Sequence, residues 1–211
     1  HNGIYNSCNT YFANVYLRII GKYNSTPYAV DVWSNHVKSF GLGQFMGYDL
    51  PTGRKGHIPD SKTYKKMYPN GGWRSTAIVS NAIGQGEVKV TPLQMANIAA
   101  LIANRGWFYT PHFVRSIGNK KIVTKNQRHR TLIDAQHFEP VIEGMRRVVN
   151  EDGGTGKRAA VKGIVVCGKT GTAQANYAKN GGIEKHYVSS FVGYFPADKP
   201  EYTCIVVVHD P

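Results

Sequence analysis

Helical spacing of apolar residues marks three segments of the chain. In the first, predicted over about residues 9–21, the repeating apolar positions are Phe12, Val15, Tyr16, Ile19 and Ile20, and Gly21 ends the run. The second opens with a capping Thr91, a Pro at the first helical position and Gln94 three residues after the cap. It is apolar on every side up to Ile102, which predicts a buried helix. The third begins near Asp134 and ends at Gly153-Gly154.

The stretch from residue 41 to residue 73 has no such period. It is rich in Gly, Pro, Tyr and Lys, with turn signals at 41–43 and at Leu50-Pro51-Thr52-Gly53. We therefore expect a long irregular excursion, and loops of this length tend to be functional.

The final third of the chain changes from helical to strand patterning. Residues 163–167, 188–195 and 202–208 are β-branched and aromatic runs separated by Gly, Asn and Pro clusters. Short connections predict that these strands are antiparallel neighbours. The expected fold class is therefore α/β (α+β), an antiparallel sheet packed with helices, with the opening elements of the fold missing.

Composition is that of one compact domain, because 41% of the residues are hydrophobic and only 18% are charged. Lys and Arg number 26 against 13 Asp and Glu, which gives a net charge of +13. This balance suggests an acidic partner such as nucleic acid, anionic lipid or a carboxylate-bearing polymer. The basic residues form no stripe with a motif that reads RNA or DNA, so we expect no nucleic-acid binding.

Three cysteines, Cys8, Cys167 and Cys204, are widely spaced and form no Cys-x-x-Cys pair. Neither a zinc site nor a disulfide-dependent fold is expected. No apolar run reaches the ~18 residues of a transmembrane helix, and no signal peptide is present. The chain begins abruptly before its first helix, so we expect that it is a fragment whose anchor lies elsewhere.

Two short motifs can carry chemistry. Ser7-Cys8-Asn9 precedes the first helix, and Lys169-Thr170-Gly171-Thr172 is expected to end the first of the late strands. By chance, Lys-Thr-Gly occurs in about one chain in twenty of this length and Ser-x-Asn in about half, so neither motif alone decides the function. Taken alone, Ser7 also fits a helix cap, Asn9 a turn residue and Lys169 an edge-strand lysine.

A competing pattern overlaps the second motif. Residues 163–170 match the phosphate-binding loop Gly-x4-Gly-Lys-Thr letter for letter. Such a loop needs flexible residues and a helix directly after its Lys-Thr pair. Ile164 to Cys167 favour extended backbone instead, and Gly171-Thr172 is a poor helix start. Nucleotide binding therefore remains only the remote alternative.

Taken together, the motifs and the text between them resemble the class B penicillin-binding proteins. The segments that carry the resemblance are Ser7-x-Asn9, residues 83–86, residues 91–96 and Gly168 to Gln174, in the family's order. The resemblance covers essentially the whole chain, taken as the C-terminal portion, residues 1–211, of a transpeptidase domain. Residues 7 to about 150 are closest to the elongation type and residues 190–198 to the division type; the elongation type is favoured narrowly.

The resemblance implies a serine D,D-transpeptidase that cross-links peptidoglycan stem peptides through an acyl-enzyme. In that family the serine matching Ser7 relays a proton, Asn9 holds a substrate amide, and Lys169 supplies positive potential. Hydroxyls of Thr170 and Thr172 bind the substrate carboxylate, and the Thr172 NH is an oxyanion donor. Gly171 leaves room for the substrate beside the strand. No metal or cofactor is implied.

No Ser in the sequence is followed by Lys three positions later, so the family's nucleophile is expected upstream. The implied ligands are D-Ala-D-Ala stem peptides and β-lactams, and the implied partner is a SEDS-family glycan polymerase. The implied location is the periplasmic face of the bacterial inner membrane. The alternative function is a non-catalytic β-lactam or muropeptide sensor, because sensors share this fold.

Overall fold

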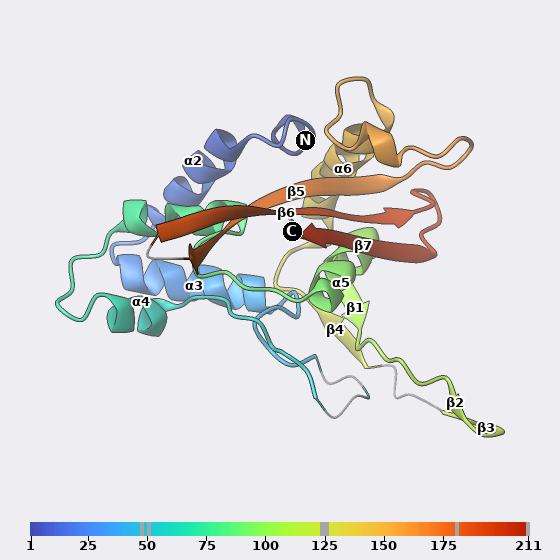
Figure 1. The fold of residues 1–211 in the computed structure, drawn as a ribbon, viewed down its shortest axis with the longest axis horizontal. Coiled ribbons are helices and arrows are strands. Elements are labelled where there is room, and N and C mark those ends of the chain that lie inside the picture. Colours follow the sequence, from blue (N-terminus) through green and yellow to red (C-terminus); the bar gives the residue numbers. More distant parts are fainter. Residues whose placement is uncertain (47–48, 50–51, 123–126, 180–181, 210–211) are drawn as a thin grey trace.

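The computed structural model describes residues 1–46, 49, 52–122, 127–179 and 182–209; for 175–179 and 182–184 it describes the backbone alone. Its first half is a group of short helices around an aromatic core (Figure 1). The helices are α1 (Asn2–Tyr5), α2 (Asn9–Ile20), α3 (Thr26–Lys38), α4 (Ser61–Met67) and the 3₁₀ helix η1 (Ser75–Ile83). Their shared core contains Tyr16, Ile20, Ala29, Val30, Tyr64 and Ile78. Helix η1 packs directly on α2.

The second half is an antiparallel sheet with two helices on one face. Strands β5 (Cys167–Lys179), β6 (Gly182–Phe195) and β7 (Tyr202–His209) pair in the order β5-β6-β7, so β5 is an edge strand of this sheet. Helix α5 (Pro92–Ala103) contacts β6 and β7, whereas α6 (Glu139–Asn150) contacts β5. The core between these layers contains Ala99, Ala103, Met145, Cys167, Val192 and Tyr194.

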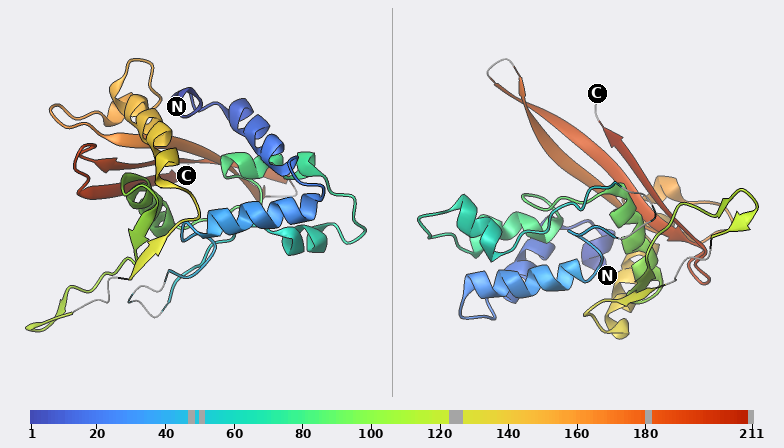
Figure 2. Two further views of the ribbon diagram at one scale, coloured as in Figure 1. Left: turned by 180° about the vertical axis from the view of Figure 1, so that it is seen from behind. Right: turned by 90° about the horizontal axis from the view of Figure 1, so that it is seen from below.

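Smaller elements extend from this body. Strand β1 (Trp107–Tyr109) pairs with β4 (Arg128–Arg130), and β2 (Ser116–Ile117) pairs with β3 (Lys120–Lys121). The β2-β3 hairpin projects away from the helices and the main sheet in each view (Figures 1 and 2). The 3₁₀ helix η2 (Ala135–Phe138) leads into α6, and η3 (Lys157–Ala159) lies between α6 and β5.

The three predicted helices are confirmed with small differences at their ends. Helix α2 begins at Asn9, and α5 has the predicted capping box, with Thr91 Oγ1 accepting from the Gln94 NH and the Gln94 side chain accepting from the Thr91 NH. Of α5, alternate positions such as Ala99 and Leu101 are fully buried, whereas Ile98 and Ile102 are only half-buried. The third segment opens as a 3₁₀ turn and becomes α-helical only at Glu139.

The first late strand was placed wrongly. β5 begins at Cys167, so Lys169-Thr170-Gly171 stands near its start and not at its end. Residues 161–164 close a small turn instead, with Gly163 at φ 83° and a bridge between Val161 and Ile164. The strand then continues beyond Thr172 because each of its residues has a partner in β6. His186, which falls between the predicted strands 163–167 and 188–195, is therefore in β6, opposite Ala175.

The expectation for residues 41–73 holds only in part. Helix α4 lies inside this stretch, begun by Asp60, whose carboxylate accepts from the Thr63 NH at 3.0 Å. Residues 50 and 51 of the expected turn lie outside the described residues. Helix α3 was not predicted, although Ser25 caps it and Pro27 stands in its first turn, both ordinary start signals.

Candidate active site

Ser7 lies in the turn that joins α1 to α2. Its backbone has φ 49°, in the left-handed region that non-glycine residues rarely adopt. Its NH donates to the Ile4 carbonyl at 3.1 Å. The cap of α2 is Cys8, whose Sγ accepts from the Tyr11 NH at 3.4 Å. The reading of Ser7 as a helix cap is therefore wrong, and its hydroxyl is directed elsewhere.

Lys169 approaches that hydroxyl from the sheet. Its Nζ donates to Ser7 Oγ at 2.8 Å and to the Thr170 carbonyl at 2.7 Å, although Ser7 and Lys169 are 162 positions apart. The fold therefore brings together the two motifs that the sequence singled out. Burial lowers the pKa of the Lys169 ammonium, because a low-dielectric surrounding disfavours the charged form.

A cavity of about 380 Å³ opens beside this pair. Its lining residues are Ser7, Asn9, Phe12, Ala82, Ile83, Gln85, Lys169, Thr170, Gly171 and Thr172. Helix α2 and the end of η1 supply one side of the cavity and β5 the other, so the edge strand faces the helix that starts at Asn9. All six residues singled out from the sequence border this one space.

The strand side of the cavity is shaped by two neighbours of β5. Thr170 Oγ1 is 2.9 Å from Thr155 Oγ1, a hydrogen bond to the loop after α6. Ser190 Oγ donates to the Gly171 carbonyl at 3.4 Å, and a Cβ at Gly171 would lie 2.7 Å from that hydroxyl oxygen. A side chain at Gly171 would therefore displace Ser190, a steric reason for glycine that the sequence did not show.

Several lining residues were missed by sequence reasoning. Phe12 was read only as part of an apolar helical face, and Ala82 and Ile83 carry no chemical signal. Gln85 stands between Gly84 and Gly86, which have φ 70° and 69°, a backbone conformation that favours glycine. A polar residue between two such glycines was the available signal for Gln85.

The alternative of a phosphate-binding loop is wrong. Gly168, Lys169 and Thr170 are paired residues of β5, and the strand runs on to Lys179 where a phosphate loop would begin a helix.

Among the residues that the structure describes, no three His, Cys, Asp or Glu side chains gather where they could hold a metal ion. Within the same residues, no helix is long and apolar enough to cross a membrane.

Comparison with known proteins agrees with this geometry. The penicillin binding protein transpeptidase domain family matches residues 1–211. The peptidoglycan D,D-transpeptidase MrdA of Acinetobacter baumannii is 30% identical over 98% of this chain. The chain spans 31% of that relative's length. The structure of Pseudomonas aeruginosa PBP2 in complex with WCK 5153 superposes with TM-score 0.77 at 26% identity, over 98% of this chain and 43% of that one.

A second solved structure describes a larger assembly. It is a peptidoglycan synthase complex, described as coordinating polymerization and crosslinking, and one of its chains matches with TM-score 0.73 at 28% identity. The match covers 98% of this chain and 32% of that one. Because the family match extends over every residue, the chain belongs to the penicillin-binding protein transpeptidase domain family.

Proposed function

We propose that the protein containing this chain is a peptidoglycan D,D-transpeptidase that cross-links stem peptides through an acyl-enzyme and is inhibited by β-lactams. The observation that carries the proposal is the 2.8 Å hydrogen bond from Lys169 Nζ to Ser7 Oγ at the wall of a cavity bordered by an edge strand. A lysine beside a serine hydroxyl gives that hydroxyl a route to accept and pass on a proton.

Ser7 and Lys169 form the proposed proton relay. Acyl transfer needs a proton delivered to the leaving amine, and a hydroxyl hydrogen-bonded to an ammonium can deliver it and be reprotonated. Burial lowers the pKa of Lys169, which makes proton donation by its ammonium easier near neutral pH. Asn9, at the first turn of α2, is the proposed partner of a substrate amide.

Strand β5 is the proposed substrate platform. An edge strand has one row of backbone groups free to pair with an extended peptide, which is a common mode of peptide recognition. The Thr170 and Thr172 hydroxyls would bind the terminal carboxylate of the stem peptide, and the Thr172 NH would donate to the oxyanion. Gly171 keeps the strand surface open between them.

The nucleophile belongs to a segment outside this sequence, because none of its serines has the Ser-x-x-Lys spacing. The proposed division of roles therefore assigns this chain the proton relay, the oxyanion donor and the carboxylate clamp. The attacking serine and its own lysine come from the remainder of the protein.

Elongation of the cell wall is the proposed setting. The relatives named MrdA and PBP2 support the elongation type, and the synthase complex supports a membrane-bound SEDS-family glycan polymerase as partner. The net charge of +13 suits a carboxylate-bearing polymer as substrate. Such a protein would act at the periplasmic face of the inner membrane.

The test is acylation and cross-linking by the full-length protein. Fluorescent penicillin should label it, and it should join D-Ala-D-Ala stem peptides; label without cross-linking would indicate a sensor. Lys169→Met should slow acylation by about 10²-fold or more, the usual size of a lost proton-transfer group. The exposed Lys162→Met is the matched control and should acylate as the wild type does. Absence of label on the wild type would contradict the proposal.

A further inference from the structure

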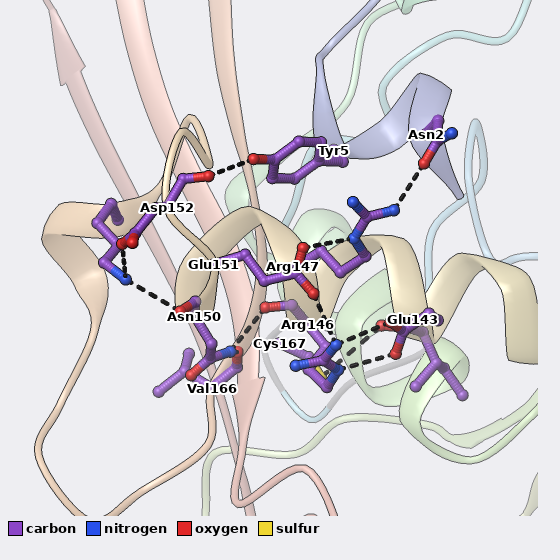
Figure 3. A network of polar contacts seen from close by, with 12 residues as sticks. Asn2, Tyr5, Glu143, Arg146, Arg147, Asn150, Glu151, Asp152, Val166 and Cys167 are labelled. Atoms are coloured by element: carbon purple, nitrogen blue, oxygen red, sulfur yellow. Dashed lines mark hydrogen bonds and ion pairs between the residues drawn. The ribbon is translucent and has the colours of Figure 1, made fainter.

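The C-terminal half of α6 is bonded to the N-terminal helix α1 (Figure 3). Arg147 Nη1 donates to Asn2 Oδ1 at 2.6 Å, and its guanidinium carbon lies 4.5 Å from the centre of the Tyr5 ring. The Tyr5 hydroxyl donates to the Asp152 carbonyl just beyond α6. Both ends of α1 are thus held to the same helix by polar contacts.

The position of α1 fixes that of Ser7. The Ser7 NH donates to the Ile4 carbonyl at 3.1 Å, and the Cys8 NH donates to the Gly3 carbonyl at 2.9 Å. Helices α1 and α6 are also in close contact, since a Cβ at Gly144 of α6 would lie 2.8 Å from Ile4 Cβ of α1. A displacement of α1 along α6 would therefore move the Ser7 turn with it.

Helix α6 also holds strand β5, which carries Lys169. Asn150 Nδ2 donates to the Val166 carbonyl at 2.8 Å, and Val166 directly precedes β5 (Figure 3). Val166 is itself buried in a cluster with Val148 and Val149 of α6. Helix α6 thus holds both the helix that leads to Ser7 and the strand that carries Lys169, through Arg147 and Asn150 on consecutive turns.

An ion pair at the C-terminal end of α6 orients the Arg147 side chain that contacts α1. Its Nε donates to Glu151 Oε2 at 2.7 Å, and the hydrogen bonds to Arg147 and Arg146 lower the pKa of the Glu151 carboxyl. Arg146 makes similar pairs, with Glu143 at 2.8 Å and Glu151 at 2.9 Å. The contacts of Arg147 extend further, to Asn2 and Tyr5 of α1.

We infer that Arg147 is a positioning residue, which through Asn2 and Tyr5 holds α1 so that Ser7 keeps its left-handed backbone and its hydrogen bond to Lys169. The left-handed φ of 49° belongs to the end of α1 itself, because the NH groups of Ser7 and Cys8 bond back to the Ile4 and Gly3 carbonyls of that helix. A shift of α1 therefore shifts the Ser7 hydroxyl. The consequence for catalysis rests on the proposed function; the structural coupling does not.

Hydrogen exchange on the full-length protein tests the coupling without any reaction. Arg147→Met should raise exchange of the Ser7 and Cys8 amides, which are bonded to α1, by about tenfold or more. Arg146→Met, which breaks ion pairs on the same helix and leaves the contacts of Arg147 with Asn2 and Tyr5 in place, is the matched control and should leave these amides protected. Equal exchange in the two variants would overturn the inference.

Acylation by benzylpenicillin tests the consequence. In Arg147→Met the maximal acylation rate should fall about tenfold, because small misplacements of a reacting group are costly, while the concentration for half-saturation stays unchanged. Asn2→Leu should lower the acylation rate to the same extent, whereas Asn2→Asp, which keeps an acceptor oxygen, should acylate as the wild type does. Arg146→Met acylating as slowly as Arg147→Met would overturn the inference, whereas a wild type that resists acylation would overturn the proposed function and leave the exchange result standing.

Discussion

Lys169 illustrates how a functional residue can oppose stability. Its ammonium is half-buried, and burial lowers its pKa from the ordinary 10.5. Between the folded and unfolded pKa values the unfolded chain binds more protons, so this lysine makes stability rise with pH across that window. Below the lowered pKa the full cost of burying the charge is present. Strained or costly groups of this kind are expected at functional sites.

The prediction is that Lys169→Met raises the melting temperature of the full-length protein at neutral pH. The advantage should shrink as the pH rises through the lowered pKa and past 10.5, because above 10.5 the wild-type lysine is mostly neutral in both states. Thermal unfolding at several pH values measures it. Lys162→Met, at an exposed position, should show no such trend. A loss of stability at neutral pH in Lys169→Met would show that the bonds to Ser7 and Thr170 outweigh desolvation.

For Ser7, the local sequence alone gave the wrong structural role. A serine before a helix is most simply a cap, and only the structure shows that Cys8 takes this place. The roles of Ser7 and Lys169 came from the order of the family's motifs, not from local propensity. Their side chains are 2.8 Å apart although 162 positions separate the two residues in the sequence, and no local pattern can predict such a contact.

At the scale of elements, Gln94 ties helix α5 to the long excursion before it. Its side chain is 1% exposed and completes the capping box with Thr91. Its Nε2 also donates to the carbonyls of Gly41, Gln44 and Lys55, at 3.3, 3.1 and 3.0 Å. A residue that sequence reasoning assigned only to a helix start therefore also anchors the loop.

Gln94→Met should lower the free energy of unfolding by about 1–3 kcal/mol, because a side chain of similar size leaves buried carbonyls without their donor. Denaturant unfolding of the full-length protein provides the measurement. Gln44→Met is the matched control, since the Gln44 side chain is exposed and, among the residues that the structure describes, donates to one carbonyl, that of Lys38 at 3.3 Å. Equal effects of the two substitutions would contradict the anchoring role of Gln94.

Element boundaries followed tertiary pairing wherever local pattern and pairing disagreed. Ile164 and Val165 favour strands by type, yet they are 40% and 46% exposed and lie outside β5. The segment after Thr172 has weak strand propensity, yet it is paired throughout with β6. Helices α2 and α6 were predictable because their apolar faces repeat at the helical period, and α5 because of its capping box and its apolar run.

At the scale of the whole molecule, an apolar cavity of about 260 Å³ lies next to the cavity of the candidate site, and Phe12 and Lys169 line both. Its lining residues are Ile4, Phe12, Met95, Ile98, Ala99, Ile102, Val141, Met145, Lys169 and Val192. Among these residues, Ile98 and Ile102 of α5 are only half-buried. Filling this space would remove apolar surface from water at about 25 cal/mol per Å².

The last prediction follows from this division of the site between segments. The 211-residue chain incubated with benzylpenicillin should keep its unmodified mass, because it has the relay and the clamp but no Ser-x-x-Lys serine. The full-length protein, treated identically, should gain one hydroxylamine-sensitive adduct, and intact-mass spectrometry reads both. A stoichiometric adduct on the 211-residue chain would mean that one of its own serines, foremost Ser7, is the nucleophile. In that case Lys169 in its neutral form would accept the Ser7 proton as the serine attacks, and Ser7 would not be a proton relay.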